Sequence, residues 1–170
     1  LADMLVGLVE YRDPFFRGNT SLTRLLTVAM ARELKISPGP TSAIALGAVL
    51  RDVGQFPLRN ALNRPGLELP AGARKNMERH VDTALEMMSG VKLPQITRDT
   101  VRHHHERFDG EGYPDGLKGD AIPLGARIVA VADSFSAMIS PRPHRLPKRV
   151  PVALDDVRQA AGTQFDPAVV

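Results

Sequence analysis

Apolar residues recur at helical spacing along most of the chain. Leu22, Leu25, Leu26, Ala29 and Met30 stand at positions i, i+3, i+4, i+7 and i+8, which predicts a helix from about residue 20 to residue 34. The apolar positions farther along predict three more helices, over about Thr41–Asp52, from Met77 to an end at Gly90, and over Ile128–Met138. Pro94 and Pro151 each predict the start of a further helix, and these two helices run to His105 and to about Ala161. No segment alternates apolar and polar residues as a half-buried strand would. The pattern therefore predicts an all-α fold, a helical bundle.

Prolines and glycines separate the predicted helices. The segment 38–40, Pro-Gly-Pro, is predicted to end the first helix, and Gly54 the second. Residues 63–70 contain two Pro and one Gly and are predicted to form a loop. Pro94 and Pro151 suit the first turn of the helices that follow them, because proline has no N–H to leave unpaired there.

Composition narrows the class of protein. The 170 residues are enough for one domain with a proper core. The net charge of +3 is too small to indicate nucleic-acid binding, and the absence of Cys excludes a disulfide framework and a zinc–thiolate site. The longest apolar run, 43–50, is too short to span a membrane. We expect a single cytoplasmic domain over residues 1–170, and the start at Leu1, without an initiator Met, indicates excision from a longer protein.

One stretch stands out chemically: three consecutive histidines, His103–His105, run into an acidic, glycine-rich segment. Glycines let a loop adopt positive φ and let its backbone approach a ligand or partner closely. Imidazole and carboxylate groups beside such a loop suit iron, manganese or zinc. The alternative is a solvated turn after a helix with no metal. His103 is the odd member of the three, and we expect it to be solvated.

The same stretch resembles a family signature. His104-His105-Glu106, followed by Asp109-Gly110-x-Gly112-Tyr113-Pro114-x-Gly116-Leu117-x-Gly119, is similar to the motif of HD-GYP domains. The resemblance extends from about Arg12 to Val170. It implies an all-helical, metal-dependent phosphodiesterase acting on cyclic di-GMP, within a longer multidomain signalling protein. The loop Asp109–Gly119 would then be exposed at the mouth of the histidine cluster, where it could also bind a protein partner.

The resemblance also implies a set of metal ligands. Five residues match the family's ligand positions: Asp52, His80, His104, His105 and Asp133. Asp52 is in addition the implied catalytic residue. Taken singly, His80 could be a hydrogen-bonded core histidine, and Asp133 a carboxylate paired with a backbone group or an arginine. The five positions together, at family spacing, favour a site.

Two ligand positions depart from the family pattern. Asn19 and Arg51 stand where the family has histidine, and Gln55 replaces the usual lysine. A guanidinium stays protonated and has no lone pair to give, so Arg51 would place a fixed charge where a metal should bind. We expect it to reach Asp52 or Asp133 and to replace one metal. The remaining half of the site leaves room for one divalent ion, iron, manganese or zinc, or for none.

A candidate phosphate site follows the last metal position. Arg142 and Arg145 match two basic residues that contact nucleotide phosphates in the family, and the planar guanidinium suits phosphate. The alternative is a basic surface loop, because Lys148 and Arg149 lie close by.

Three functions remain open on the sequence alone. The first is a degenerate HD-GYP signalling domain that binds cyclic di-GMP or a protein partner with weak or no hydrolysis. The second is a working phosphodiesterase with a reduced metal site. The third is an interaction module that binds neither metal nor nucleotide. Metal content and turnover separate the first two, and nucleotide binding separates the third.

Overall fold

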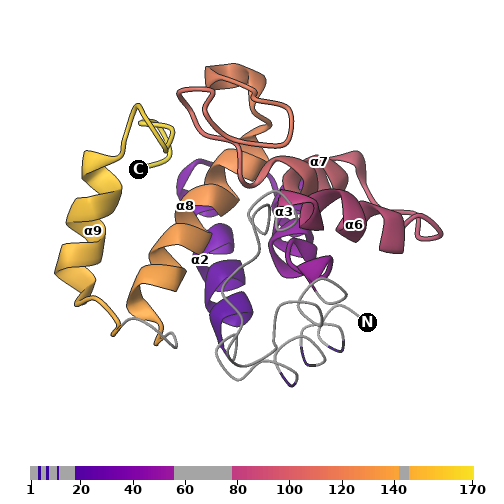
Figure 1. The fold of residues 1–170 in the computed structure, drawn as a ribbon, viewed down its shortest axis with the longest axis horizontal. Helices are drawn as coiled ribbons and strands as arrows, with labels where there is room; N and C mark the ends of the chain where they lie inside the picture. Colours follow the sequence, from indigo (N-terminus) through magenta and orange to yellow (C-terminus); the bar gives the residue numbers. More distant parts are fainter. Residues whose placement is uncertain (1–3, 5–6, 8–10, 12–17, 56–77, 142–145) are drawn as a thin grey trace, which may run out of the picture.

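The chain folds as a bundle of helices. The computed structural model describes residues 4, 7, 11, 18–55, 78–141 and 146–170. The elements in these ranges, shown in Figure 1, are α2 (Asn19–Glu33), α3 (Pro38–Leu50), α6 (His80–Met87), α7 (Gln95–His103), the short 3₁₀ turn η2 (Gly119–Ala121), α8 (Leu124–Ile139) and α9 (Val150–Gln159). Across these ranges the only β pairing is an isolated bridge between Ala161 and Phe165. The all-α prediction is confirmed.

The turn between α2 and α3 differs from its prediction. Pro38 does not end a helix but begins α3, where proline fits the first turn. What ends α2 is Lys35, which adopts a left-handed φ of 56°. Its N–H donates to the Arg32 carbonyl, and the Ile36 N–H donates to the Ala31 carbonyl, both at 2.9 Å. This pair of hydrogen bonds is a common helix ending, in which glycine usually occupies the left-handed position.

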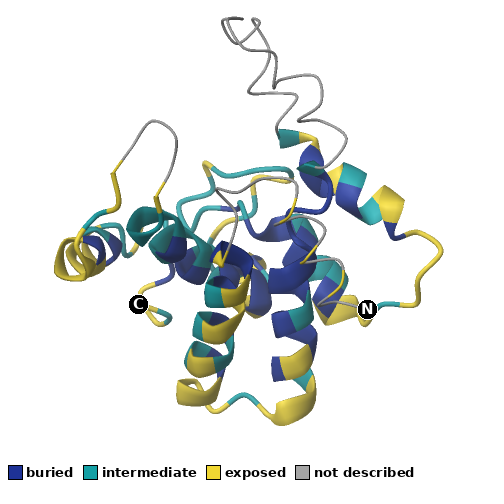
Figure 2. Cartoon of the chain, turned by 90° about the horizontal axis from the view of Figure 1, so that it is seen from below, coloured by how far each residue is buried: buried dark blue, intermediate teal, exposed yellow. Residues whose placement is uncertain are grey.

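Helix α3 lies at the centre of the described bundle. It packs against α2, α7 and α8, and eight of its 13 residues are buried. Figure 2 shows buried positions gathered toward the interior and exposed ones on the outer helical faces. One core cluster joins α2, α3 and α8, and a second joins α3, α6 and α7. The residues that follow α3, Arg51 and Asp52, are therefore held deep in the molecule.

Gly54 lets the end of α3 meet α6 at very short range. A Cβ added at this position would lie 1.9 Å from the carbonyl oxygen of His80 and 2.5 Å from the amide nitrogen of Ala84. No side chain fits there, so glycine is required. The sequence pattern marked Gly54 only as a helix breaker, whereas the structure shows that it also brings His80 next to the segment that carries Arg51 and Asp52.

No helix in the described ranges is both long enough and apolar enough to cross a bilayer.

Candidate metal centre

Arg51 is a fully buried cation between two carboxylates. It is the C-cap of α3, and its side chain is 0% exposed. Its Nη2 lies 2.5 Å from Asp133 Oδ1 on α8 and 3.2 Å from Asp52 Oδ2. Its Nη1 donates to the carbonyl of Ala48. The predicted reach of Arg51 to both carboxylates is confirmed.

The charge on Arg51 is fixed at any ordinary pH. Burial by itself lowers the pKa of the guanidinium, but the attraction of Asp133 and then of Asp52 outweighs it and raises the pKa above its usual value. A cation without a lone pair thus holds together two carboxylates that the family resemblance implies as metal ligands.

Three histidines form a separate group beside this ion pair. His80 begins α6, while His104 and His105 directly follow α7. One ligand nitrogen from each lies within 4.8 Å of the others, the spacing of a group that could hold one ion. The ring centroids of His104 and His105 are 4.0 Å apart, and that of His80 lies 5.0 Å from His105 and 5.5 Å from His104.

The ring nitrogens of His104 and His105 are in the form that binds metal. Burial is the main cause that lowers the pKa of His104 well below its ordinary value, followed by the charges of His105 and His80. Burial and then His80 lower the pKa of His105 to about 4. His104 Nδ1 lies 2.8 Å from the Val101 carbonyl, so the neutral ring donates its proton there and keeps the lone pair on Nε2.

The Nε2 atom of His104 supplies a test of whether a metal fits. It is buried and has no hydrogen-bond partner among the described residues. An unpaired buried acceptor is costly, and coordination to an ion beside His80 and His105 would relieve the cost. Imidazole nitrogens suit zinc and iron, and three of them do not select one of these ions over the other. The residues present therefore fit one divalent ion.

Asp52 lies close enough to His105 for its charge to act on the pKa of that ring, but both of its oxygens already have other partners. One of its oxygens pairs with Arg51, and the other accepts a hydrogen bond from Gln55 Nε2 at 2.5 Å. The structure thus divides the five implied ligands into two sets: the three histidines, and the two carboxylates around Arg51. The roles of Asp52 as catalytic residue and of all five as ligands stay predictions.

Asn19 links helix α2 to helix α8 through a hydrogen bond. It is the first residue of α2, is 3% exposed, and its Oδ1 accepts a hydrogen bond of 2.7 Å from the hydroxyl of Ser136 on α8. Its backbone carbonyl accepts from Thr23 Oγ1 at 2.9 Å. The side-chain oxygen that could have served as a weak ligand is therefore already used.

The glycine-rich loop covers the histidines, as predicted. Tyr113 stacks on His105 with ring centroids 4.8 Å apart, and its N–H donates to the His105 carbonyl at 3.3 Å. A Cβ added at Gly112 would lie 2.3 Å from the amide nitrogen of Arg107, so the close return of the chain requires glycine there. No residue from Asp109 to Gly119 is fully buried. Asp109, Gly110, Pro114 and Gly116 belong to the same half-covered loop.

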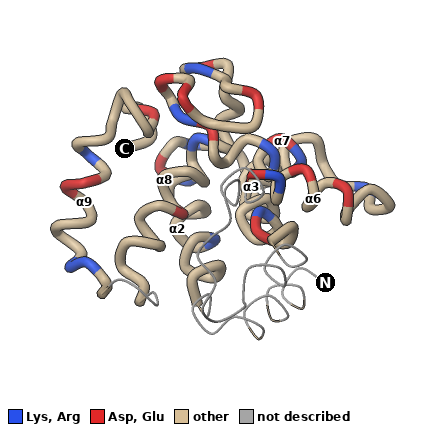
Figure 3. Tube along the Cα trace, in the orientation of Figure 1, with Lys and Arg blue, Asp and Glu red and all other residues tan. Residues whose placement is uncertain are grey.

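The solvated position expected for His103 is wrong. His103 is 9% exposed, its Nδ1 lies 3.0 Å from the Asp99 carbonyl, and its Nε2 lies 2.9 Å from Asp115 Oδ2. Arg102 makes two hydrogen bonds to the same carboxylate, which lower the pKa of Asp115. The loop folds back onto α7 and covers the first histidine. Figure 3 shows both acidic and basic residues along this loop and on the helices beside it.

Glu106 is a structural residue of the site that the sequence reasoning missed. It is 3% exposed, and its two oxygens accept the N–H groups of Asp115 at 2.8 Å and Leu117 at 3.1 Å. One carboxylate therefore fixes the far side of the loop next to the histidines. The available signal was an acidic residue placed directly between a His pair and a glycine-rich segment that has many N–H groups to satisfy.

The predicted phosphate contacts, Arg142 and Arg145, lie outside the described residues.

The chain matches a family model described as "HD domain" over residues 3–169. A curated relative, the "Cyclic di-GMP phosphodiesterase response regulator RpfG" of Xanthomonas campestris, is 39% identical over 173 residues, covering 98% of this chain and 44% of the relative. The "Cyclic di-GMP phosphodiesterase" of Thermotoga maritima is 34% identical over 171 residues, covering 99% of this chain and 46% of the relative. The chain thus spans a little under half the length of these two proteins.

Solved structures share the fold. The structure of Bd1817, described as a HDG"Y"P protein from Bdellovibrio bacteriovorus, superimposes with a TM-score of 0.67 at 20% identity, covering 89% of this chain and 49% of that one.

Proposed function

Because this chain belongs to the HD domain family and carries the HD-GYP signature, we propose that it is a degenerate signalling domain that binds cyclic di-GMP, or a protein partner, with weak or no hydrolysis. The observation that carries the proposal is the buried ion pair of Arg51 with Asp133 and Asp52. The domain would act as one part of a longer signalling protein.

The physical argument is that Arg51 competes with a metal for the same carboxylates. Two-metal hydrolysis needs ions that stabilise both the attacking and the leaving oxygen. A guanidinium neutralises the carboxylates and cannot coordinate or exchange ligands. Because Asn19 Oδ1 accepts a hydrogen bond from Ser136, this side-chain oxygen of α2 is also not free to coordinate a metal. Cyclic di-GMP is proposed as the ligand because it is the substrate in the names of both curated relatives.

The other half of the site favours a second candidate, a phosphodiesterase with a reduced metal set. His80, His104 and His105 would hold the ion, which when bound supplies Lewis acidity toward a phosphate oxygen. The unpaired buried Nε2 of His104 is the observation that supports this alternative. What the chain itself contributes is orientation: the Val101 carbonyl fixes the tautomer of His104, and Tyr113 holds the plane of His105.

Nucleotide binding would use Arg142 and Arg145 in either case. If the protein binds cyclic di-GMP, exchanging both arginines for alanine should weaken binding by about tenfold or more, because two charge-assisted phosphate contacts are lost. Isothermal titration calorimetry on the parent and on Arg142→Ala/Arg145→Ala measures this. Lys148→Ala, a nearby basic residue paired with Asp156, is the matched control. Unchanged affinity in the double variant would show that the two arginines do not contact the nucleotide.

Three measurements on one preparation separate the functions. Metal is counted by mass spectrometry, cyclic di-GMP binding by calorimetry, and turnover by chromatography of the linear product. Binding without turnover selects the degenerate domain. Turnover that depends on a single ion per chain selects the reduced enzyme. Absence of both nucleotide binding and turnover contradicts a role in cyclic di-GMP binding or hydrolysis and leaves a domain that acts only through a protein partner.

A further inference from the structure

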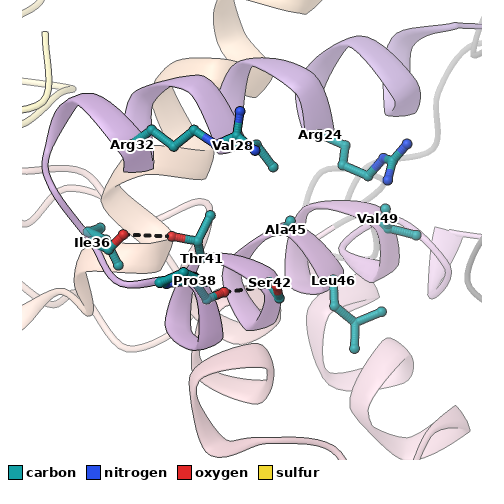
Figure 4. Close-up of a pocket in the computed structure, with 10 residues that line it drawn as sticks. All are labelled: Arg24, Val28, Arg32, Ile36, Pro38, Thr41, Ser42, Ala45, Leu46 and Val49. Atoms are coloured by element: carbon teal, nitrogen blue, oxygen red, sulfur yellow. Dashed lines mark hydrogen bonds between the residues drawn. The ribbon is translucent and has the colours of Figure 1, made fainter.

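A groove runs between α2 and α3 on the outer side of the bundle (Figure 4). It encloses about 460 Å³. Its wall on α2 is formed by Arg24, Val28 and Arg32, and its wall on α3 includes Ser42, Ala45, Leu46 and Val49. None of the proposed metal ligands lines it. The groove therefore is a second surface feature, separate from the histidine cluster.

The two arginines stand on either side of an apolar centre. Arg24, Val28 and Arg32 are spaced by four residues, so their side chains lie along one face of α2, and the arginines are two turns, or about 12 Å, apart. Across from Val28 the groove is lined by Ala45, Leu46 and Val49 of α3, and Figure 4 shows these side chains on the facing helix. The surface is thus basic at both ends and apolar between them.

Both guanidinium groups are available to a partner. Arg24 and Arg32 are exposed, and neither takes part in an ion pair or side-chain hydrogen bond in the described part of the chain. No Asp or Glu is among the residues that line the groove. Exposed arginines to which the described residues offer no carboxylate give the groove a positive charge that an acidic partner would complement.

We propose that this groove binds an acidic amphipathic helix of a partner polypeptide. Two carboxylates seven or eight residues apart on that helix would each pair with one arginine, and apolar side chains three or four residues after the first would cover Val28 and Leu46. A helix lying between two helices is a common mode of peptide recognition. Two cations with an apolar centre between them match two separated carboxylates better than one compact phosphate.

An NMR titration tests the proposal. The ¹⁵N-labelled protein is titrated with a helical peptide of about 16 residues that carries two glutamates seven positions apart and leucines at the third and fourth positions after the first glutamate. We expect shift changes concentrated on the α2 and α3 residues that line the groove. Arg24→Glu/Arg32→Glu should weaken binding by about tenfold or more, and a peptide with lysines in place of the glutamates should then bind the reversed variant better than the parent.

Matched controls keep the outcome clear. Arg149→Glu changes an exposed arginine outside the groove and should leave peptide affinity unchanged. If the reversed variant does not fold by circular dichroism, Arg24→Gln/Arg32→Gln replaces it. Absence of shift changes in the groove, or affinity unaffected by the charge change, overturns the proposal. So does a stronger response of the same residues to anionic phospholipid vesicles or to cyclic di-GMP than to the peptide.

Discussion

Arg51 decides the chemistry at the residue scale. The same nitrogen of Arg51, Nη2, forms ion pairs with its neighbour Asp52 and with Asp133, which is distant in the sequence. Two buried carboxylates without a cation would repel each other and would be costly to ionise. Arg51 supplies the cation that neutralises both of them.

Removing the cation alone should therefore destabilise the protein. We expect Arg51→Ala to lower the free energy of unfolding by roughly 1–3 kcal/mol, because it leaves the buried Asp52 and the half-buried Asp133 without their partner. Urea unfolding followed by circular dichroism measures the change. Arg24→Ala, an exposed arginine with no described partner, is the control and should alter stability by less than about 0.5 kcal/mol.

A double-mutant cycle separates the ion pair from simple loss of packing. In an Asp133→Asn background, Arg51→Ala should cost less than it does in the parent, because one of the two repelling charges is gone. Equal costs in both backgrounds would mean that Arg51 stabilises the protein through its bulk and not through its charge.

The buried histidines predict a pH dependence. The pKa of His105 is about 4 in the folded protein, and that of His104 is also lowered, against about 6.5 in an unfolded chain. The unfolded state therefore binds more protons between pH 6.5 and 4, so stability is present above this window and is lost as the pH falls through it. With chelator present, the free energy of unfolding should fall by roughly 1–3 kcal/mol between pH 7 and pH 5.

His105→Gln supplies the comparison for this titration. It removes one of the two titrating rings, so its unfolding free energy should depend less steeply on pH over the same range. A parent whose urea midpoint is constant from pH 7 to pH 5 would show that these histidines are as accessible to protons in the folded state as in the unfolded one.

Sequence reasoning at this scale worked where a side chain's reach depends on its neighbours in the chain. Arg51 is adjacent to Asp52, and the family spacing brought Asp133 within range, so the pairing could be predicted. His103 and Glu106 could not be placed, because their partners Asp115 and Leu117 come from a loop whose fold-back depends on Gly112 and on tertiary contacts. No spacing rule specifies such a return of the chain.

At the scale of elements, the sequence pattern predicted each described α-helix. The residues at which the helices begin and end were predicted less well. The segment 38–40 was ambiguous, because proline both ends one helix and begins the next. No residue in the sequence predicted that α2 ends at Lys35, because lysine occupies the left-handed position where glycine is usual. Packing of Ile36 and Ala31 in the core shared by α2, α3 and α8 fixes that turn instead.

The contact between α3 and α6 gives a prediction about element placement. Gly54→Ala should push α6 away, because the new Cβ would lie 1.9 Å from the His80 carbonyl, and His80 would leave its group with His104 and His105. We expect a loss of stability of about 1–3 kcal/mol and a weaker affinity for added zinc, measured by competition with a fluorescent chelator.

Gly39→Ala is the matched control for this substitution. Gly39 lies in the first turn of α3, and a Cβ there meets nothing within 4 Å. Alanine favours helix over glycine, so stability should be unchanged or rise by up to about 1 kcal/mol, with zinc affinity retained. If Gly54→Ala behaves like Gly39→Ala, the close approach of α3 to α6 does not position the histidines.

At the scale of the whole molecule, one bundle holds two differently built groups of side chains at the positions implied as metal ligands. The histidine group retains neutral imidazoles and an unpaired nitrogen, while the carboxylate group is neutralised by an internal cation. The family motif predicted which positions would come together, because it encodes spacing within a conserved arrangement of helices. It did not predict that Asp52 would use both oxygens on Arg51 and Gln55, which depends on the substituted side chains themselves.

Replacing Arg51 should therefore change the number of metal ions that the protein binds. Asn19→His/Arg51→His restores two imidazoles and removes the competing charge, so it should bind more metal than the parent. Asn19→His/Arg51→Lys is the control that adds one imidazole and keeps a cation, and it should gain little.

The most direct measurement is the number of metal ions per chain, determined by mass spectrometry after purification in the same medium. We predict at most one ion in the parent and in the lysine control, and additional metal in Asn19→His/Arg51→His. A parent that already holds two ions per chain, or a double histidine variant that holds no more than the parent, would contradict the role assigned to Arg51.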